Sequence, residues 1–346
     1  MLTSLKINKF TVFEDAQLSF SKGLNICIGE NSTGKTHILK LVYAILKSLG
    51  KNEKSKEELE KRIAKYLSQV FMPDHLGRLV ARRPYAGQTN ATIEATWGKS
   101  GKLGFKFSTR ASKNATVTEY NYEQIPAPSL FIPPKEILSI YSGFRQALTE
   151  RELNFDITYL DLAKALDAAP LKGPRLELIR RHLDIIESIM AGDISKNEQG
   201  FYFYSHKGRG NLEAPLMAEG LRKLGMLAYL LRNGALTKRS TLLWDEPEAN
   251  LNPRLIKQMA EILFKLSQDM QVIVATHSLF LLKEFEILES THRHNRKNRP
   301  FTSYISLYLA DGLVNLEQTK SIDELSSVVA LDEELAQDGR YLELED

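Results

Sequence analysis

The stretch Gly29-Glu30-Asn31-Ser32-Thr33-Gly34-Lys35-Thr36 fits the pattern G-x-x-x-x-G-K-[ST] at every fixed position. A short apolar run, Leu24–Ile28, precedes it, and apolar residues at helical spacing follow it between Ile38 and Leu46. The pattern requires this order of strand, glycine loop and helix. The alternative, a chance glycine turn before a helix, is disfavoured because all four fixed positions and both flanks agree.

This loop supplies the groups that a bound nucleotide needs. Its glycines let successive backbone N–H groups turn toward a phosphate, and the N-terminus of the following helix adds partial positive charge. We expect Lys35 to reach the β- and γ-phosphates and Thr36 to hold Mg²⁺. The candidate nucleotide ligands are Gly29, Glu30, Asn31, Ser32, Thr33, Gly34, Lys35 and Thr36.

The composition is that of a soluble globular chain, long enough for one large or two ordinary domains. The 346 residues are 43% hydrophobic and 26% charged, and the formal net charge is +3. No apolar run approaches the roughly 18 residues of a membrane helix, and no cleavable leader is evident. The single cysteine, Cys27, excludes an internal disulfide. We therefore expect a cytoplasmic protein that needs no membrane.

Hydrophobic periodicity predicts a chain of mixed strands and helices. Strands are expected at Leu5–Phe10, Leu18–Ile28, Thr92–Trp97, Leu103–Ser108, Ala115–Tyr120, Leu130–Ile132, Phe201–Tyr204, Thr241–Trp244 and Val272–Ala275. Helices are expected at 36–49, 52–70, 218–232, 255–266, 279–284 and over most of 135–192, and a hairpin at 301–318 turns at Asp311-Gly312.

Two carboxylates end one of these strands. Asp245 and Glu246 follow the apolar run Thr241–Trp244. In P-loop folds such a strand lies beside the glycine-loop strand and directs its aspartate toward Mg²⁺. Glu246 is then placed to act as a general base or to position the attacking water. A helix N-cap or a solvated loop is the structural alternative, and the separate glycine loop weighs against it.

A histidine follows the next strand of this kind. Val272–Ala275 leads into Thr276-His277-Ser278, where His277 would face the γ-phosphate and donate a hydrogen bond to it. A lone histidine after a strand is more often structural. Three strand-end elements in this order nevertheless favour the functional interpretation.

Together these segments resemble an ABC-type ATPase head of the SMC/RecF/OLD-like group, often classed as AAA-15 or AAA-21 ATPases. The resemblance extends over residues 3–318 and includes Glu248–Pro253 beside the segments above. It implies an α/β fold with a mixed sheet, an antiparallel β subdomain and an inserted helical lobe. It also implies ATP and Mg²⁺ as ligands, hydrolysis by Glu246 with His277, and a homodimer or higher homo-oligomer. In this family two heads pair head to tail around two ATP molecules.

The resemblance also assigns boundaries. Residues 1–132 are expected to form the first ATPase lobe, 133–215 the helical lobe, and 216–346 the second ATPase lobe. Asn250 begins the D-loop, Asn250–Pro253, which crosses the dimer interface in this family.

The signature motif is where the chain departs from the family pattern L-S-G-G-[QE]. In the corresponding stretch, Met217–Lys223, Gly220 keeps a close backbone approach, but Ala218 replaces the serine that binds the partner's γ-phosphate. One charge-assisted hydrogen bond, about 1.5–3 kcal/mol, is therefore missing. Arg222 and Lys223 are the candidate replacements.

A second departure concerns the Q-loop, for which no glutamine is evident. The segment that enters the helical lobe is Pro133-Pro134-Lys135-Glu136, so Lys135 or Glu136 is the candidate for its sensing role. Both departures bear on the rate of hydrolysis more than on the binding of ATP.

The sequence around Pro133–Glu136 suggests a biological role through a second resemblance. Phe131–Ser139, followed by Gly143-Phe144, resembles ATPase subunits of bacterial antiphage defence operons, which work beside a nuclease or toxin. The incomplete signature disfavours a transporter subunit, and the compact 135–192 region excludes long coiled-coil arms. We expect an ATPase that controls a separate effector. The alternatives are a non-hydrolysing, nucleotide-gated scaffold and a RecF-like DNA repair ATPase.

A dense basic loop at 292–299 is the candidate contact with nucleic acid. Most charge runs are merely solvated, and contact with DNA backbone or an acidic partner is the functional alternative. No aromatic residues are interleaved, so stacking on single-stranded bases is unsupported. The basic residues are His292, Arg293, His294, Arg296, Lys297 and Arg299.

Overall fold

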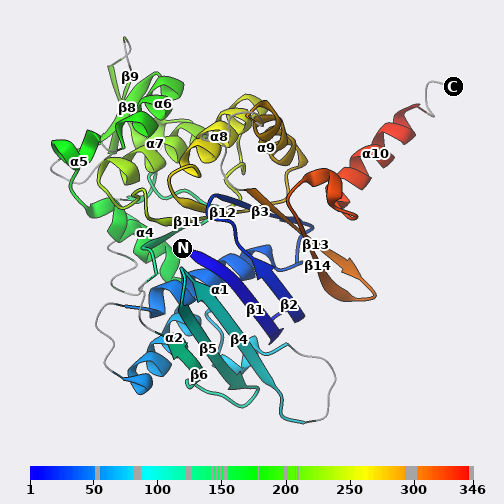
Figure 1. Ribbon diagram of the computed structural model, residues 1–346. Coiled ribbons are helices and arrows are strands. Elements are labelled where there is room, and N and C mark those ends of the chain that lie inside the picture. Colours follow the sequence, from blue (N-terminus) through cyan, green and yellow to red (C-terminus); the bar gives the residue numbers. More distant parts are fainter. Residues whose placement is uncertain are drawn as a thin grey trace.

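A central six-stranded sheet organises the chain (Figure 1). Its order is β14-β13-β3-β12-β11-β7, in which every pair is parallel except the edge pair β13–β14. The bounds are β3 Leu24–Gly29, β7 Ser129–Ile132, β11 Thr241–Asp245, β12 Gln271–Thr276, β13 Thr302–Ala310 and β14 Leu313–Thr319. The computed structural model describes residues 1–50, 55–81, 87–121, 126–141, 155–177, 179–197, 202–206, 210–292 and 302–342, and also 143, 144, 147, 150 and 208.

The inner strands of this sheet are buried on both faces. Every residue of β11 and of β12 is buried, as expected for parallel strands that are covered on both sides. Successive side chains alternate between two cores, so that Leu242 and Trp244 pack into one and Leu243 into the other.

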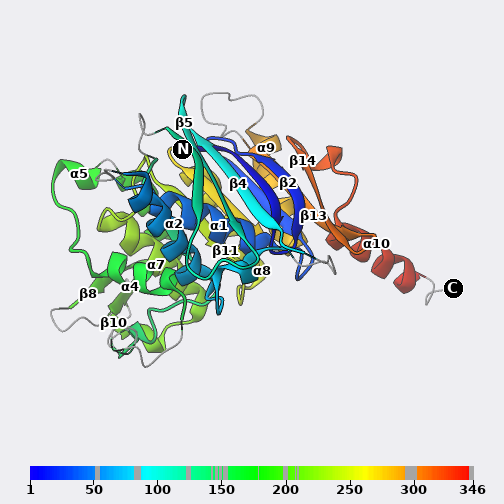
Figure 2. The same cartoon turned by 90° about the horizontal axis from the view of Figure 1, so that it is seen from below.

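One face is covered by helix α1 and an antiparallel sheet, and the other by a layer of helices (Figures 1 and 2). The antiparallel sheet has the order β2-β1-β4-β5-β6, with α2 and the short η1 beside it. These elements are β1 Leu2–Phe10, β2 Phe13–Ser19, β4 Asn90–Trp97, β5 Gly101–Ser108, β6 Thr116–Asn121, α1 Lys35–Ser48, α2 Lys56–Phe71 and η1 Leu76–Leu79.

The opposite layer contains the inserted lobe and the helices that follow it. In the lobe, α4, α5 and α6 accompany a three-stranded antiparallel sheet of order β10-β9-β8. The elements are α4 Ile157–Asp167, α5 Pro174–Glu177, α6 Arg180–Met190, β8 Gly192–Lys196, β9 Tyr202–His206, β10 Gly210–Glu213, η2 Ala214–Leu216, α7 Glu219–Arg232, α8 Pro253–Leu266 and α9 Leu279–Thr291.

The C-terminal hairpin confirms the predicted turn. Asp311 and Gly312 both have left-handed φ values, of 53° and 71°, which suit a two-residue hairpin. After η3 (Ile322–Glu324), helix α10 (Val329–Leu342) points away from the body (Figure 1). Among the helices that the structure describes, none is both long and apolar enough to cross a membrane.

Two local predictions were wrong, and two strands were not predicted. The expected strand Leu18–Ile28 is the end of β2 and all but the last residue of β3, separated by a turn in which Ser21 N donates to Asn25 Oδ1. The acidic strand β11 does not lie beside β3, because β12 lies between them. The lobe has the predicted strand near 201–204 but also β8 and β10, and β10 has no buried residue that could reveal it. The lobe boundaries at 132 and 215 stay predictions.

One buried amide joins the central sheet to the antiparallel sheet. The side chain of Gln271, at the start of β12, is fully buried. Its Oε1 accepts from Leu2 N at 3.0 Å, and its Nε2 donates to Leu2 O at 2.8 Å and to Ser21 O at 2.7 Å. The amide therefore satisfies both backbone groups of the residue that begins β1.

Replacing Gln271 by Met should destabilise the fold while keeping a similar side-chain volume. The substitution leaves three backbone groups unpaired, at about 1–3 kcal/mol each, so the free energy of unfolding should fall by about 3 kcal/mol or more. Urea denaturation measures the change. The matched control is Gln17→Met on an exposed position of β2, which should change stability by no more than about 0.5 kcal/mol. Equal effects of the two substitutions would contradict the assignment.

Candidate nucleotide-binding site

Three chemically distinct segments follow strands that end at one edge of the central sheet. Ile28 is in register with Thr276, and Ala275 with Asp245. Since the carboxyl ends of parallel strands meet at one edge, the glycine loop, the acidic turn and His277 emerge together there. The predicted convergence is therefore present, with β12 as the intervening strand.

The glycines of the loop are required by space as well as by backbone conformation. Gly34 has φ 94°, and a Cβ there would lie 2.6 Å from Phe13 Cζ and from Val12 Cγ2. A Cβ on Gly29 would lie 2.2 Å from the carbonyl oxygen of Leu307. Phe13 itself is fully buried in the core. The loop is thus held against the β1–β2 hairpin and β13.

The loop lysine lies folded over its own loop. Lys35 Nζ donates to Gly29 O and to Glu30 O, both at 2.7 Å, and the residue is buried. Burial lowers the pKa of its ammonium, and the carboxylates of Glu246 and Asp245 oppose that shift. A phosphate that enters the loop would compete for these donors, which is the role expected of this lysine.

The predicted metal ligands are in direct contact. Thr36 Oγ1 donates to Asp245 Oδ2 at 2.8 Å. The other carboxylate oxygen of Asp245 is buried and has no hydrogen-bond partner among the described residues. Burial raises the pKa of Asp245 to about 6, and the hydrogen bond from Thr36 only partly offsets this.

These two residues fit Mg²⁺. A hydroxyl and a carboxylate are hard oxygen ligands, and Mg²⁺ is usually held by one or two carboxylates together with substrate phosphates. The buried oxygen without a partner is the group that a cation would satisfy. Across the described ranges, no group of three or more His, Cys, Asp and Glu residues offers another metal site.

The candidate base occupies a left-handed turn directly after β11. Glu246 has φ 50°, and its N–H donates to Ala275 O at 2.8 Å. His277 Nδ1 lies 3.5 Å from Glu246 Oε1, and both side chains remain partly open to solvent. A left-handed non-glycine residue is an unfavourable conformation that is often found at functional sites.

Glu248, to which the sequence analysis gave no role, is a buried residue of this turn that contacts the end of β12. Its side chain is buried and accepts a hydrogen bond from Thr276 Oγ1. Burial raises its pKa. His277 Nδ1 is 4.0 Å from its Oε1, so both carboxylates of the turn lie close to the histidine. The only signal in the sequence was a second glutamate two residues after the first.

The predicted signature region contacts the predicted D-loop within the same chain. Ala218 is the N-cap residue of α7 and makes no side-chain cap bond. Asn250, with φ 61°, donates from Nδ2 to Glu219 Oε1 at 3.0 Å. A Cβ on Gly220 would lie 2.6 Å from Leu255 Cδ1. The close approach at Gly220 is thus explained by packing on α8.

Both candidate replacements for the missing serine have partners in this chain. Arg222 Nε donates to Glu136 Oε1 at 2.6 Å, and Lys223 is buried with its Nζ donating to Ala249 O at 2.7 Å. Glu136, the Q-loop candidate, is therefore tied to the signature helix, whereas Lys135 is exposed.

Most of the basic loop lies outside the described residues, which end at His292 before resuming at Thr302. His292 packs on Phe264, and its Nδ1 lies 2.8 Å from Leu288 O. Its position is explained by the end of α9, so nothing here tests the predicted contact of residues 293–299.

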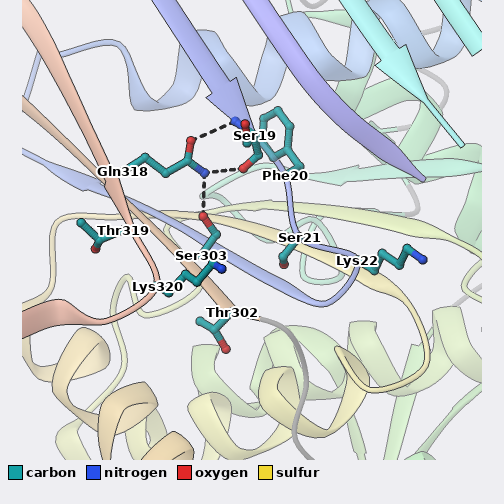
Figure 3. Close-up of a pocket in the computed structure, with 9 residues that line it drawn as sticks. All are labelled: Ser19, Phe20, Ser21, Lys22, Thr302, Ser303, Gln318, Thr319 and Lys320. Carbon is teal, nitrogen blue, oxygen red and sulfur yellow. Dashed lines mark hydrogen bonds between the residues drawn. The ribbon is translucent and has the colours of Figure 1, made fainter. Parts of the chain in front are cut away.

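A hollow of about 620 Å³ lies elsewhere, between the end of β2 and the β13–β14 hairpin (Figure 3). Thr302 is in register with Leu24 at the start of β3, so this hollow is at the opposite edge of the sheet from the glycine loop. Gln318 spans it, accepting from Ser19 N at 2.9 Å and donating to Ser303 Oγ at 2.6 Å. None of the predicted nucleotide-site residues, all of which the structure describes, lines it.

Comparisons with known proteins agree with the fold and the motifs. Residues 118–283 match the family described as "AAA domain, putative AbiEii toxin, Type IV TA system". A segment of 42 residues is 45% identical to the DNA replication and repair protein RecF of Streptococcus gordonii (strain Challis). That match spans 12% of this chain and only 12% of the length of RecF.

In structure the chain is similar to head domains of SMC proteins. An Smc head bound to the C-winged helix domain of ScpA aligns at TM-score 0.57 and 15% identity, covering 93% of this chain and 98% of that chain. The SMC head of Thermotoga maritima aligns at TM-score 0.52 and 13% identity, covering 92% and 98%. The Pyrococcus furiosus Smc head with an extended coiled coil gives 0.52 and 13%, covering 98% and 99%.

The chain therefore has the α/β fold of SMC-type ABC ATPase heads, with their mixed and antiparallel sheets. The family match, the RecF segment and these structures together support an ABC-type ATPase of the SMC/RecF group, which confirms the resemblance seen in the sequence.

Lys35→Ala should abolish nucleotide binding and leave the fold intact. The substitution removes the cation that faces the phosphates, so ATP affinity in the presence of Mg²⁺ should fall by about 100-fold or more. Isothermal titration calorimetry measures it. Lys106→Ala, on an exposed position of β5, is the control and should bind as wild type does. Unchanged affinity in Lys35→Ala would contradict the assignment of the glycine loop as the nucleotide-binding site.

Asp245→Asn should stabilise the protein when neither nucleotide nor metal is present. The pKa of Asp245 rises from 3.8 to about 6 on folding, so the ionised carboxylate costs stability above pH 6 and nothing below pH 4. The expected gain is about 3 kcal/mol at pH 7, fading between pH 6 and pH 4. Urea denaturation at several pH values tests it, with Asp74→Asn at an exposed position as control. A gain that is equal at pH 4 and pH 7 would show that burial of charge is not its cause.

Proposed function

We propose that this chain binds ATP with Mg²⁺ and hydrolyses the γ-phosphate. The observation that carries this proposal is the hydrogen bond of 2.8 Å between Thr36 and Asp245, beside the buried Lys35. A glycine loop followed by a lysine and a hydroxyl binds phosphates, and a strand-end aspartate completes the metal site. When bound, Mg²⁺ supplies positive charge beside the phosphates.

The hydrolytic step is assigned to Glu246. Its carboxylate is partly exposed at the sheet edge where the loop opens, so it is placed to orient a water molecule and to accept its proton. His277, 3.5 Å away, donates a hydrogen bond toward the γ-phosphate in this proposal. The left-handed conformation of Glu246 fixes the direction in which the carboxylate leaves the strand.

Dimerisation on ATP is the second part of the proposal. Leu216 and Ala218, which directly precede α7, are exposed, and Leu216 exposes 69% of its area. An exposed large apolar side chain beside a signature motif is consistent with a face that a second copy covers. Asn250, the first residue of the predicted D-loop, donates a hydrogen bond to Glu219 at this end of α7. We therefore place the head-to-tail contact at this surface.

Control of a separate effector is the third part. The description of the matching family names a toxin of a toxin–antitoxin system, which is consistent with ATPase subunits of antiphage defence. Among the described residues, no group of three or more His, Cys, Asp and Glu residues could hold a metal ion. In this proposal a nuclease or toxin chain from the same operon performs the effector chemistry, and the ATPase sets its state.

The RecF segment favours a second candidate, a DNA repair ATPase. A non-hydrolysing scaffold gated by nucleotide uses the same pocket and is the remaining alternative. Turnover measured with and without duplex DNA separates these possibilities. Strong stimulation by DNA favours the repair role, and absence of turnover favours the scaffold.

Glu246→Gln keeps the shape of the side chain and removes the carboxylate. Steady-state phosphate release should fall by about 100-fold or more, the usual scale of a lost acid–base group, and ATP-bound dimer should accumulate in size-exclusion chromatography. Glu333→Gln, at an exposed position of α10, is the control and should turn over as wild type does. If wild-type turnover does not exceed that of Lys35→Ala, hydrolysis is disproved and the scaffold interpretation prevails.

A further inference from the structure

A lysine of helix α7 is buried beneath the catalytic turn. Lys223 lies three residues after Gly220, and only 1% of its surface is exposed. Its Nζ donates to Ala249 O at 2.7 Å and, at the longer distance of 3.5 Å, to Glu246 O. Both acceptors belong to the turn that begins with the candidate base, so the ammonium contacts the backbone of the residue to which we assign hydrolysis.

Burial of this charge is costly, and the surroundings show what offsets the cost. Burial lowers the pKa of the Lys223 ammonium, while nearby carboxylates favour its charged form. A buried cation is tolerated when it is both paired and hydrogen-bonded. The four carboxylates, from three separate parts of the chain, are Glu219, Glu248, Glu246 and Glu136.

The turn that Lys223 contacts is compact. Ala249 N donates to Glu246 O at 3.1 Å, and Leu251 N donates to Glu248 O at 3.0 Å. Within it, Glu246 is held at φ 50°. Because the carbonyl of Glu246 is shared between Ala249 N and the ammonium, a shift of Lys223 changes the orientation of the peptide that follows the glutamate.

Two further contacts join the same turn to the start of α7. Asn250 Nδ2 donates to Glu219 Oε1 at 3.0 Å. Leu251 and Leu255 pack against Gly220 so closely that a Cβ there would lie 3.0 Å and 2.6 Å from them. The first turns of α7 and the turn 246–251 are therefore in contact through three residues of the helix, Glu219, Gly220 and Lys223.

We propose that Lys223 is a positioning residue that couples the placement of helix α7 to the catalytic conformation of Glu246. It touches neither nucleotide nor metal, and it acts through the carbonyls of Glu246 and Ala249. A contact made at the exposed residues Leu216 and Ala218, just before α7, is transmitted to the base of the same chain by this ammonium. The catalytic part of this inference rests on the proposed function.

The first test separates positioning from binding. Lys223→Met should lower kcat by about 10- to 100-fold, because small misplacements of a catalytic group have costs of this order, and should change KM for ATP by less than about threefold. The double variant Lys223→Met with Glu246→Gln should turn over no more slowly than Glu246→Gln alone. A further loss in the double variant would show that Lys223 does not act through Glu246.

The second test does not require hydrolysis. In the nucleotide-free protein, hydrogen exchange at the amides of Glu246, Ala249 and Leu251 should accelerate at least tenfold in Lys223→Met, whereas Lys223→Arg, which keeps a cationic donor, should retain most of the protection. Lys257→Met makes the same change at an exposed position of α8 and is the control for both tests. If Lys223→Met does not fold, Lys223→Gln replaces it.

The two tests fail in distinguishable ways. Unchanged kcat together with unchanged exchange in Lys223→Met would overturn the proposal. A wild type without turnover would disprove the proposed hydrolysis, and the exchange experiment would then decide alone whether Lys223 holds the turn. Accelerated exchange with unchanged kcat would reduce Lys223 to a structural residue and would overturn the coupling.

Discussion

The hydrogen bond between Thr36 and Asp245 is the contact on which the site depends. It joins residues 209 positions apart in the chain, and it forms only if β3 and β11 are in the register that β12 imposes between them. Every other element of the site is then fixed relative to this pair. The loop is anchored on one side by packing on Val12 and Phe13, and the acidic turn by Lys223 on the other. The fold thus brings the glycine loop and the carboxylate of Asp245 into direct contact.

The same region carries charges that the fold alone does not favour. Asp245, Glu248 and Lys223 are all buried, and burial opposes the charged form of each. Apolar residues in these places would cost the nucleotide-free protein less. The simplest physical explanation is that a cation compensates the charge of Asp245 when nucleotide is bound, whereas the charge of Lys223 is already offset by its backbone acceptor and by nearby carboxylates. In the proposed function, these buried charges lower the stability of the nucleotide-free protein but serve nucleotide binding and hydrolysis.

How much the sequence could predict depended on whether a motif has a fixed spacing. The glycine loop, Asp245-Glu246 and His277 were predictable because their chemistry requires particular residues directly after strands. The order of the strands in the central sheet could not be predicted, because strand adjacency in a parallel sheet depends on crossover connections that leave no local sequence pattern. The strand β10 was missed because all four of its residues are exposed. The burial of Lys223 was not predicted, because a lysine in a helix usually has a solvated side chain and its acceptor at Ala249 lies 26 positions further along.

The strand order has a consequence for how this protein is made. The neighbours of β3 are β12 and β13, which begin at residues 271 and 302, so a ribosome has released most of the chain before β3 finds either partner. The antiparallel sheet, complete by Asn121, can assemble long before that. During the interval β3, an apolar strand with unpaired backbone, is a site for intermolecular association. The amide of Gln271, which joins Leu2 to β12, can form only once β12 has been made, and the other side of β3 stays unpaired until β13 follows at residue 302.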